Sequence, residues 1–207
     1  MKHLERLSST HPEALERAVE VLHAHGLIVF PTDTLYGLAC LPHFDEALAK
    51  VYAAKHRSHT KALPVLIANR QQLLELVSEI PECAQKLMEQ FWPGKLTLIL
   101  PKRASLPALL SPFAGIAVRM PNHPFALSLL QKTGPLAVTS ANLSEHSNHA
   151  DPVEILEELE PHLNLFIEEG ILSSTTASTI VDCTQKAPVI IRQGAIPETE
   201  IISIIRK

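Results

Sequence analysis

Glycine is scarce in this sequence, with only 7 glycines among 207 residues. The two glycine-rich phosphate-binding fingerprints, G-x-x-x-x-G-K-[ST] and G-x-G-x-x-G, do not occur. No G-x-S-x-G elbow occurs either, so a hydrolase serine of that type is unsupported. A nucleotide, if bound, must therefore be held by something other than a P-loop or a Rossmann turn.

Cysteines are also few. Cys40, Cys83 and Cys183 are odd in number, scattered, and never form a C-x-x-C pair. This pattern favours reduced thiols in a cytoplasmic protein over a disulfide framework or a zinc site.

Long apolar runs are missing. No stretch approaches the roughly 18 apolar residues of a membrane span, and the charged N-terminus lacks the apolar core of a signal peptide. We therefore expect a soluble, cytoplasmic protein without membrane contact. With 207 residues, 46% of them hydrophobic, residues 1–207 are predicted to form a single domain.

Positive charge is not in excess. The formal net charge is −4, and aromatic residues make up 4% of the chain. Proteins that coat nucleic acid are usually basic, so bulk binding of that kind is disfavoured, while a local basic patch stays open.

Hydrophobic periodicity predicts alternating helices and strands. Helices are expected over residues 10–25, 44–54, 70–77, 82–90, 124–132 and 151–160, and strands over 27–30, 63–67, 96–100, 116–120, 136–139, 165–167, 179–183 and 189–192. The tail, 197–207, reads as one helical turn or a strand. The mixture predicts an α/β class with a twisted sheet flanked by helices. The late strands are too close together for helical crossovers throughout, so part of the sheet should be antiparallel.

Two helix starts carry capping signals. Thr10 is followed by Glu13, and Asp151 by Pro152 and Glu154. Both patterns predict a capping box, in which the first side chain accepts a backbone N–H of the helix. Gly26 is expected to end the first helix.

The sequence FPTDTLYGL, residues 30–38, changes from apolar to polar within one residue. Pro31 has no N–H for a strand ladder. Thr32, Asp33 and Thr34 then place short polar side chains at the rim of a sheet, where open α/β folds bind ligands. A polar turn between a strand and a helix is the alternative.

Further polar residues lie at the ends of other predicted strands or near them, and a basic segment follows the helix over 44–54. They are Arg119, Ser140, Asn142, Ser178 and Arg192 at the strands, and Lys55, Arg57 and Lys61 in the basic segment. Together they suit a small anionic ligand, such as a nucleotide with its phosphates or a carboxylate, because arginine grips both groups with paired hydrogen bonds.

Each group also has an ordinary structural explanation. Arg119 and Arg192 can be plain strand-end charges. The basic segment can complement a helix dipole, and Ser140 and Asn142 can be turn formers. Trp92, the only tryptophan, is favoured as a core anchor over a stacking partner for a ligand.

Histidines lie close together at 146 and 149, near Asp151. No metal-site signature such as H-E-x-x-H is present, and Asp151 is already explained as a helix cap. We therefore predict structural or exposed histidines and no metal ligands.

The motifs together resemble the YrdC-type threonylcarbamoyl-AMP synthase family. The resemblance runs from Pro12 to Ile196 and rests on PTDTLYGL, KHR with Lys61, FWPGKLTLIL, AVRMPNHP, PLAVTSANLS, STIVD and IRQGAI. It implies a YrdC-like fold with a concave basic cavity. The chain is similar to the short, single-domain form, since longer relatives carry a second C-terminal domain.

The resemblance implies a nucleotidyltransferase. Such an enzyme makes L-threonylcarbamoyladenylate and pyrophosphate from L-threonine, bicarbonate and ATP, with Mg²⁺ accompanying the ATP. The product serves the t6A modification at position 37 of tRNA, through downstream transferase proteins. Weak binding of tRNA or double-stranded RNA is also open.

It further implies roles for individual residues. Lys55 and Arg57 would act in catalysis by holding the ATP phosphates, with Asn142 and Arg192 also on the nucleotide. Arg119 would clamp the threonine carboxylate. Thr34, Lys61, Ser140 and Ser178 would complete the substrate site.

Three positions depart from the family pattern: Ser58, the run Ala62-Leu63-Pro64, and the segment Glu145–Ala150, where the family usually has glycine and small residues after SANLS. The last departure leaves open a divergent paralogue that uses another carbamoyl acceptor. A double-stranded RNA or ribosome-binding module of the same fold is the other alternative.

Overall fold

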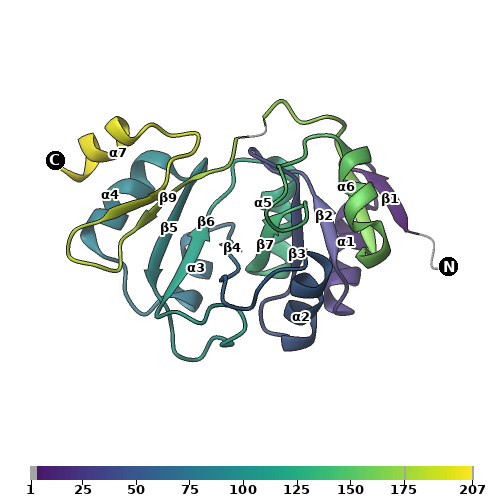
Figure 1. Ribbon diagram of the computed structural model, residues 1–207, viewed down its shortest axis with the longest axis horizontal. Coiled ribbons are helices and arrows are strands. Elements are labelled where there is room, and N and C mark those ends of the chain that lie inside the picture. The colour runs from purple at the N-terminus through teal and green to yellow at the C-terminus, as the bar shows by residue number, and fades with distance from the viewer. Residues whose placement is uncertain (1–3, 175, 207) are drawn as a thin grey trace.

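The computed structural model describes residues 4–174 and 176–206. Their strands form one ten-stranded sheet in the order β1-β8-β2-β3-β7-β4-β6-β5-β9-β10 (Figure 1). The strands are β1 (Glu5–Ser8), β2 (Ile28–Phe30), β3 (Gly37–Cys40), β4 (Val65–Leu66), β5 (Leu96–Pro101), β6 (Gly115–Arg119), β7 (Leu136–Ser140), β8 (Leu165–Glu168), β9 (Thr179–Asp182) and β10 (Val189–Arg192). Pairs such as β1–β8 and β5–β9 are parallel, and pairs such as β3–β7 and β5–β6 are antiparallel. The predicted mixed sheet is therefore confirmed.

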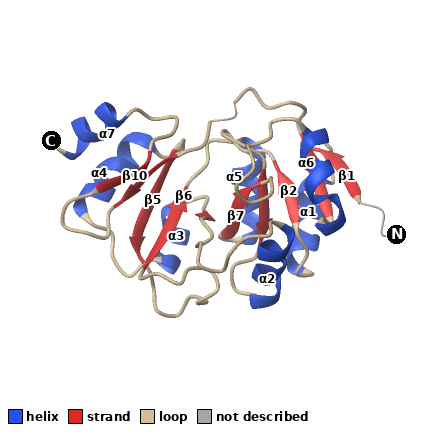
Figure 2. Ribbon diagram, viewed as in Figure 1, coloured by secondary structure: helices blue, strands red, loops and turns tan. Residues whose placement is uncertain are grey.

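Helices flank the sheet, as Figure 2 shows. They are α1 (Ala14–His23), α2 (Asp45–Ala54), α3 (Arg70–Leu76), α4 (Glu82–Phe91), α5 (Pro124–Thr133), α6 (Pro152–Leu159) and α7 (Glu198–Ile205), with a 3₁₀ turn at Glu160–His162.

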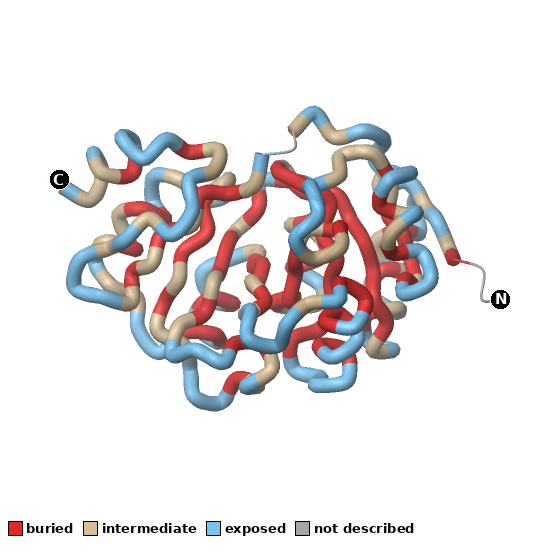
Figure 3. Tube along the Cα trace, viewed as in Figure 1, coloured by how far each residue is buried: buried red, intermediate tan, exposed pale blue. Residues whose placement is uncertain are grey.

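The core lies on both faces of the sheet. In β2, Ile28 and Phe30 belong to the cluster under α1 and α5, whereas Val29 faces the larger cluster that includes α2. A strand covered on both faces needs apolar residues throughout, which explains the unbroken run at this point of the sequence. Figure 3 shows these central strands as the buried part of the chain.

Some expected elements were wrong. Thr10 does not cap α1, which begins at Ala14 and has no side-chain cap. The Thr10 hydroxyl instead lies 2.9 Å from the Ser8 hydroxyl. By contrast, the Asp151 cap is confirmed, since its carboxylate accepts the Val153 N–H at 2.9 Å.

Other elements were missed or left open. β1 and β3 were not predicted, because β1 (ERLS) contains two charged residues and β3 (GLAC) contains no β-branched residue. The tail forms helix α7, so the strand alternative is excluded. Within the described ranges, no helix is both long and apolar enough to cross a bilayer.

Candidate functional site

The FPTDTLYGL segment is a hairpin loop between β2 and β3, which pair antiparallel from Phe30 and Gly37. Neither sequence expectation described it fully, since it connects two strands and not a strand and a helix. The Thr32 hydroxyl organises the loop: it accepts the N–H groups of Thr34 and Leu35 at 3.2 Å each and donates to the Leu35 carbonyl at 2.7 Å. The loop is therefore ordered by its own side chains.

Tyr36 braces this loop against the chain after β8. Its hydroxyl donates to the Gly170 carbonyl at 2.7 Å and accepts the Glu169 N–H at 2.9 Å. A buried phenol with both of its hydrogen-bonding roles filled by backbone acts as a structural support.

Arg119, at the end of β6, is locked in place by the hairpin loop. Its Nη1 donates to the Thr34 hydroxyl at 2.7 Å, its Nη2 pairs with Asp33, and its Nε donates to the Gly94 carbonyl at 2.9 Å. The Arg119 side chain is only 7% exposed and that of Asp33 11%. Burial lowers the pKa of Arg119, and the Asp33 carboxylate opposes this shift. Each guanidinium nitrogen is anchored, and the guanidinium has five N–H donors, so further donors remain for a ligand.

Ser178, which directly precedes β9, and Arg192, the last residue of β10, form a second polar group. Arg192 Nη2 donates to the Ser178 carbonyl at 2.9 Å and to its hydroxyl at 3.3 Å. The Ser178 hydroxyl also lies 2.7 Å from the Thr97 hydroxyl of β5. The β9–β10 register shifts between Ile190 and Arg192, which marks a β-bulge. Through this bulge both Ile191 and Arg192 line the same cavity.

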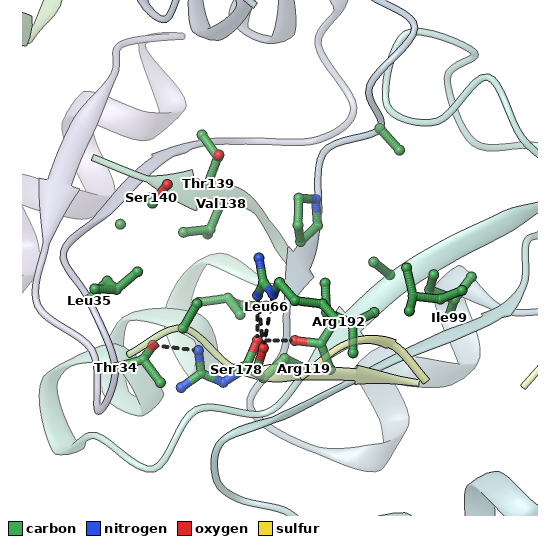
Figure 4. A pocket seen from close by; sticks show the side chains of 18 of the residues that line it. Thr34, Leu35, Leu66, Ile99, Arg119, Val138, Thr139, Ser140, Ser178 and Arg192 are labelled. Atoms are coloured by element: carbon green, nitrogen blue, oxygen red, sulfur yellow. Dashed lines mark hydrogen bonds between the residues drawn. The ribbon is translucent and has the colours of Figure 1, made fainter. Parts of the chain in front are cut away.

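The cavity between these groups has a volume of about 580 Å³. Six predicted site residues line it: Thr34, Arg57, Arg119, Ser140, Ser178 and Arg192. Figure 4 shows Thr34 bonded to Arg119 and Ser178 to Arg192, with Ser140 on another side of the cavity. Three arginines and Asp182 are the charged lining residues within the described chain. The basic character of the cavity stays a prediction.

Three predicted site residues are not among the lining residues of the described chain: Lys55, Lys61 and Asn142. Asn142 is buried, and its Nδ2 donates to the carbonyls of Leu143 and His146 at 2.9 Å each. Lys61 pairs with Glu145 at 2.9 Å. Their predicted contacts with ligands remain predictions.

Lys55 lies behind the cavity wall and is only 1% exposed. Its Nζ donates to the Ser140 carbonyl at 2.6 Å and to the Asn142 carbonyl. It therefore fixes the turn that follows β7. Burial, assisted by the positive charge of Arg57, lowers the pKa of Lys55 from 10.5 to about 7.

This shift predicts a pH dependence of stability. Because the unfolded chain keeps the lysine proton up to about pH 10 and the folded protein releases it near pH 7, the free energy of unfolding should rise with pH in between. We expect the difference in unfolding free energy between the wild type and Lys55→Met to grow from pH 7 to 8.5, by at most about 1.4 kcal/mol per pH unit. Urea denaturation at several pH values measures it. A difference that is constant over this range would contradict the assignment.

Sequence reasoning missed part of the lining. Thr97 was visible as the polar residue of an alternating strand, but only the pairing of β5 with β9 brings it to Ser178. Phe113 and Ile191, 58% and 56% exposed, add apolar surface to the lining. No sequence signal marked them, because exposed apolar residues are common on proteins.

The histidines make local contacts. His146 Nδ1 lies 2.7 Å from Glu158, and His149 Nε2 lies 3.2 Å from the same carboxylate without hydrogen-bond geometry. Burial raises the pKa of Glu158, but hydrogen bonds from Leu143 N–H and His146, together with the nearby His149, outweigh it and lower the pKa to about 2. Trp92 packs partly buried against the core, and its Nε1 donates to the Leu96 carbonyl at 2.7 Å.

Comparisons with known proteins give matches in sequence and in fold. Residues 20–194 match the family model Sua5/YciO/YrdC, described as "Telomere recombination". The threonylcarbamoyl-AMP synthase of Bacillus subtilis is 35% identical over 200 residues, which is 95% of this chain and 58% of the relative. This chain thus spans little more than half of that protein's length.

Solved structures agree. Pyrococcus abyssi Sua5 complexed with L-threonine superposes with a TM-score of 0.92 at 32% identity, over 99% of this chain and 61% of that one. E. coli YciO superposes with a TM-score of 0.84 at 28% identity, over 95% and 98% of the two chains. With a match across most of its length in sequence and in fold, the chain belongs to the Sua5/YciO/YrdC family.

Proposed function

We propose that this protein is an L-threonylcarbamoyladenylate synthase, a nucleotidyltransferase that acts on L-threonine, bicarbonate and ATP. The observation that carries the proposal is the meeting of Arg119–Thr34 and Ser178–Arg192 in one cavity. Two sets of charge-assisted donors in one cavity suit a ligand pair with a carboxylate and phosphates. The name of the B. subtilis relative and the threonine bound to P. abyssi Sua5 support it.

Arg119 is the proposed carboxylate clamp. Its guanidinium is held rigidly by Asp33, Thr34 and Gly94, so little side-chain entropy is lost when a ligand binds. Thr34 and Ser178 complete the threonine site from either side. Arg57 and Arg192 face the phosphates, and Ser140 lies at the junction of the two substrates.

The chemistry requires no covalent enzyme intermediate. The threonine amine combines with bicarbonate to give a carbamate and water. A carbamate oxygen then attacks the α-phosphorus of ATP in line, and pyrophosphate leaves. Catalysis would rest on positioning and on stabilisation of phosphoryl charge by arginine.

Mg²⁺ is expected as the companion of the ATP phosphates. The cavity lining suits Mg²⁺ that is held by the ATP phosphates better than Mg²⁺ that is held by the protein. Asp182, the one carboxylate among the described lining residues, already accepts two hydrogen bonds from Thr184. The described residues hold no cluster of three potential metal ligands. Coordination by phosphate oxygens and water is typical of Mg²⁺ bound with nucleotides.

The remaining expectations are proposals too. The single sheet supports one domain over residues 1–207. We also propose a cytoplasmic location and delivery of the product to tRNA-modifying transferases.

Pyrophosphate release tests the proposal directly. Purified protein should release pyrophosphate only when ATP, bicarbonate and L-threonine are all present, and mass spectrometry should detect threonylcarbamoyl-AMP. Omission of threonine is the control. Release that does not depend on threonine would reject the synthase.

A divergent paralogue is the second candidate, supported by the Glu145–Ala150 departure. It predicts ATP turnover with an acceptor other than threonine, so the same assay with other amino acids separates the two. Salt-dependent binding of double-stranded RNA without ATP turnover would instead indicate the RNA-binding module.

A further inference from the structure

One exposed ion pair joins two segments that each contribute a residue to the cavity lining. Lys61 precedes Ala62, a lining residue, and Glu145 lies three positions before Asn148, another lining residue. The Lys61 ammonium and the Glu145 carboxylate lie 2.9 Å apart, although the two residues are far apart in sequence. The pair therefore joins two separate segments next to residues that line the cavity.

The other end of the same two segments is tied by backbone contacts. Ser144 N–H donates to the Lys55 carbonyl at 2.9 Å, and Lys55 Nζ holds the Ser140 and Asn142 carbonyls. These contacts are buried, whereas the side chains of Lys61 and Glu145 are 46% and 79% exposed. The exposed pair is the part of this junction that can open without disrupting the core.

Glu145 adopts a backbone conformation that suits glycine. Its φ is 72°, in the left-handed region that non-glycine residues rarely adopt. A carboxylate is thus held in place at some conformational cost. Lys61 in turn lowers the pKa of Glu145, which keeps the carboxylate charged.

Lys61 differs in this respect from Arg57 and Arg192, whereas the buried Arg119 is paired with the Asp33 carboxylate. Arg57 donates to the carbonyls of Lys61 and Ala62, and Arg192 to Ser178, so these contacts are with neutral groups. Lys61 is an exposed cation whose charge is neutralised by the Glu145 carboxylate.

We infer that Glu145 is an internal competitor for Lys61, so that the cavity favours polyphosphates with enough charge to displace it. The inference rests on the proposed function, because that function supplies the polyphosphate. An exposed ion pair contributes little stability, at most about a fivefold factor in an equilibrium. A triphosphate can therefore open it, and its removal should strengthen binding modestly.

Titration calorimetry with inorganic tripolyphosphate and with ATP tests this inference. Glu145→Gln should bind both ligands about two- to fivefold more tightly than the wild type. Glu145→Gly should do the same, since glycine adopts a positive φ without strain. The gain should disappear when Lys61→Met is combined with Glu145→Gln.

The chain offers a matched control in Glu82, which pairs with Lys86 at 3.0 Å on helix α4 and is 84% exposed. Glu82→Gln should leave both affinities unchanged. Equal or weaker binding by Glu145→Gln would overturn the inference, and so would a gain that persists in the Lys61→Met background.

Failure of the proposed function has a different signature. If tripolyphosphate binds more tightly to Glu145→Gln but threonine-dependent turnover is absent, the competition by Glu145 is supported and the synthase function is rejected. If threonine-dependent ATP turnover is normal and the wild type and Glu145→Gln bind polyphosphate equally, only the competition by Glu145 is rejected. If neither the wild type nor Glu145→Gln binds tripolyphosphate or ATP, both the competition by Glu145 and the synthase function are rejected.

Discussion

Arg119→Ala should lose threonine binding and lower kcat/KM for pyrophosphate release by about 10²- to 10³-fold. Arg119 is the proposed carboxylate clamp, and its side chain is only 7% exposed. Removal of one partner from a buried, hydrogen-bonded charge pair typically costs about 2–5 kcal/mol of binding free energy, which corresponds to losses of this size.

Stability must be separated from activity in this experiment. Arg119→Ala leaves Asp33 buried without its counter-ion, and the Asp33 Oδ2 already has no hydrogen-bond partner among the described residues, so we expect this variant to lose stability as well. Arg119→Lys keeps a positive charge beside Asp33 but loses the guanidinium fork. We expect it to unfold at nearly the wild-type temperature and still to lose most threonine affinity in calorimetry.

The exposed Arg103, which donates to the Leu74 carbonyl at 2.8 Å, gives a matched control. Arg103→Ala should keep full activity. Unchanged turnover of either Arg119 variant in the ATP- and threonine-dependent assay would refute the clamp.

Gly194→Ala should disturb both stability and the site. A Cβ atom at Gly194 would lie 2.4 Å from the Ser178 carbonyl carbon and 2.5 Å from the carbonyl oxygens of Ala177 and Ser178. These are backbone atoms, so the segment must move. Overpacking of this kind costs about 1–3 kcal/mol, and in a chain of this size each 1 kcal/mol lowers Tm by about 2–4 °C.

The displaced atoms belong to the site. Arg192 donates to the Ser178 carbonyl at 2.9 Å, and Thr179 Oγ1 accepts the Gly194 N–H at 3.0 Å. We therefore expect weaker threonine and ATP binding together with the lower Tm. Gln193→Ala is the control, because that side chain has only a long 3.4 Å contact with the Ile196 carbonyl. Wild-type Tm and affinity in Gly194→Ala would contradict this account.

The sequence predicted the strongly periodic elements best. The strand around Val29 was predicted from an unbroken apolar run, and the strand around Leu98 from the leucines that alternate with other residues in LTLIL. Thr10 misled because a capping pattern is only local, while the start of α1 is set by burial of Ala14 and Ala18 under α5. β3 was missed because its four residues, GLAC, lack the length and β-branching that mark strands.

The sequence predicted which residues belong to the candidate site better than how they contact one another. Predicted strand boundaries indicated Arg119, Ser178 and Arg192, because polar residues next to apolar runs lie at a sheet rim. That Asp33 is the counter-ion of Arg119 could not be read from the sequence, since the two are brought together only by the β2–β3 hairpin and the pairing of β3, β7, β4 and β6. Lys55 was predicted to touch phosphate, and only burial shows that it holds the turn after β7.

The strand order has a consequence for how the protein forms. β1 pairs with β8, and β9 pairs with β5, so neighbours in the sheet are distant along the chain. Such a high contact order slows folding, because long loops must close before their contacts form. During synthesis at about 5–20 residues per second, Arg192 emerges roughly 10–30 s after Thr34. The cavity is thus complete only after β10 has been synthesised, and its ligands cannot assist the earlier steps of folding.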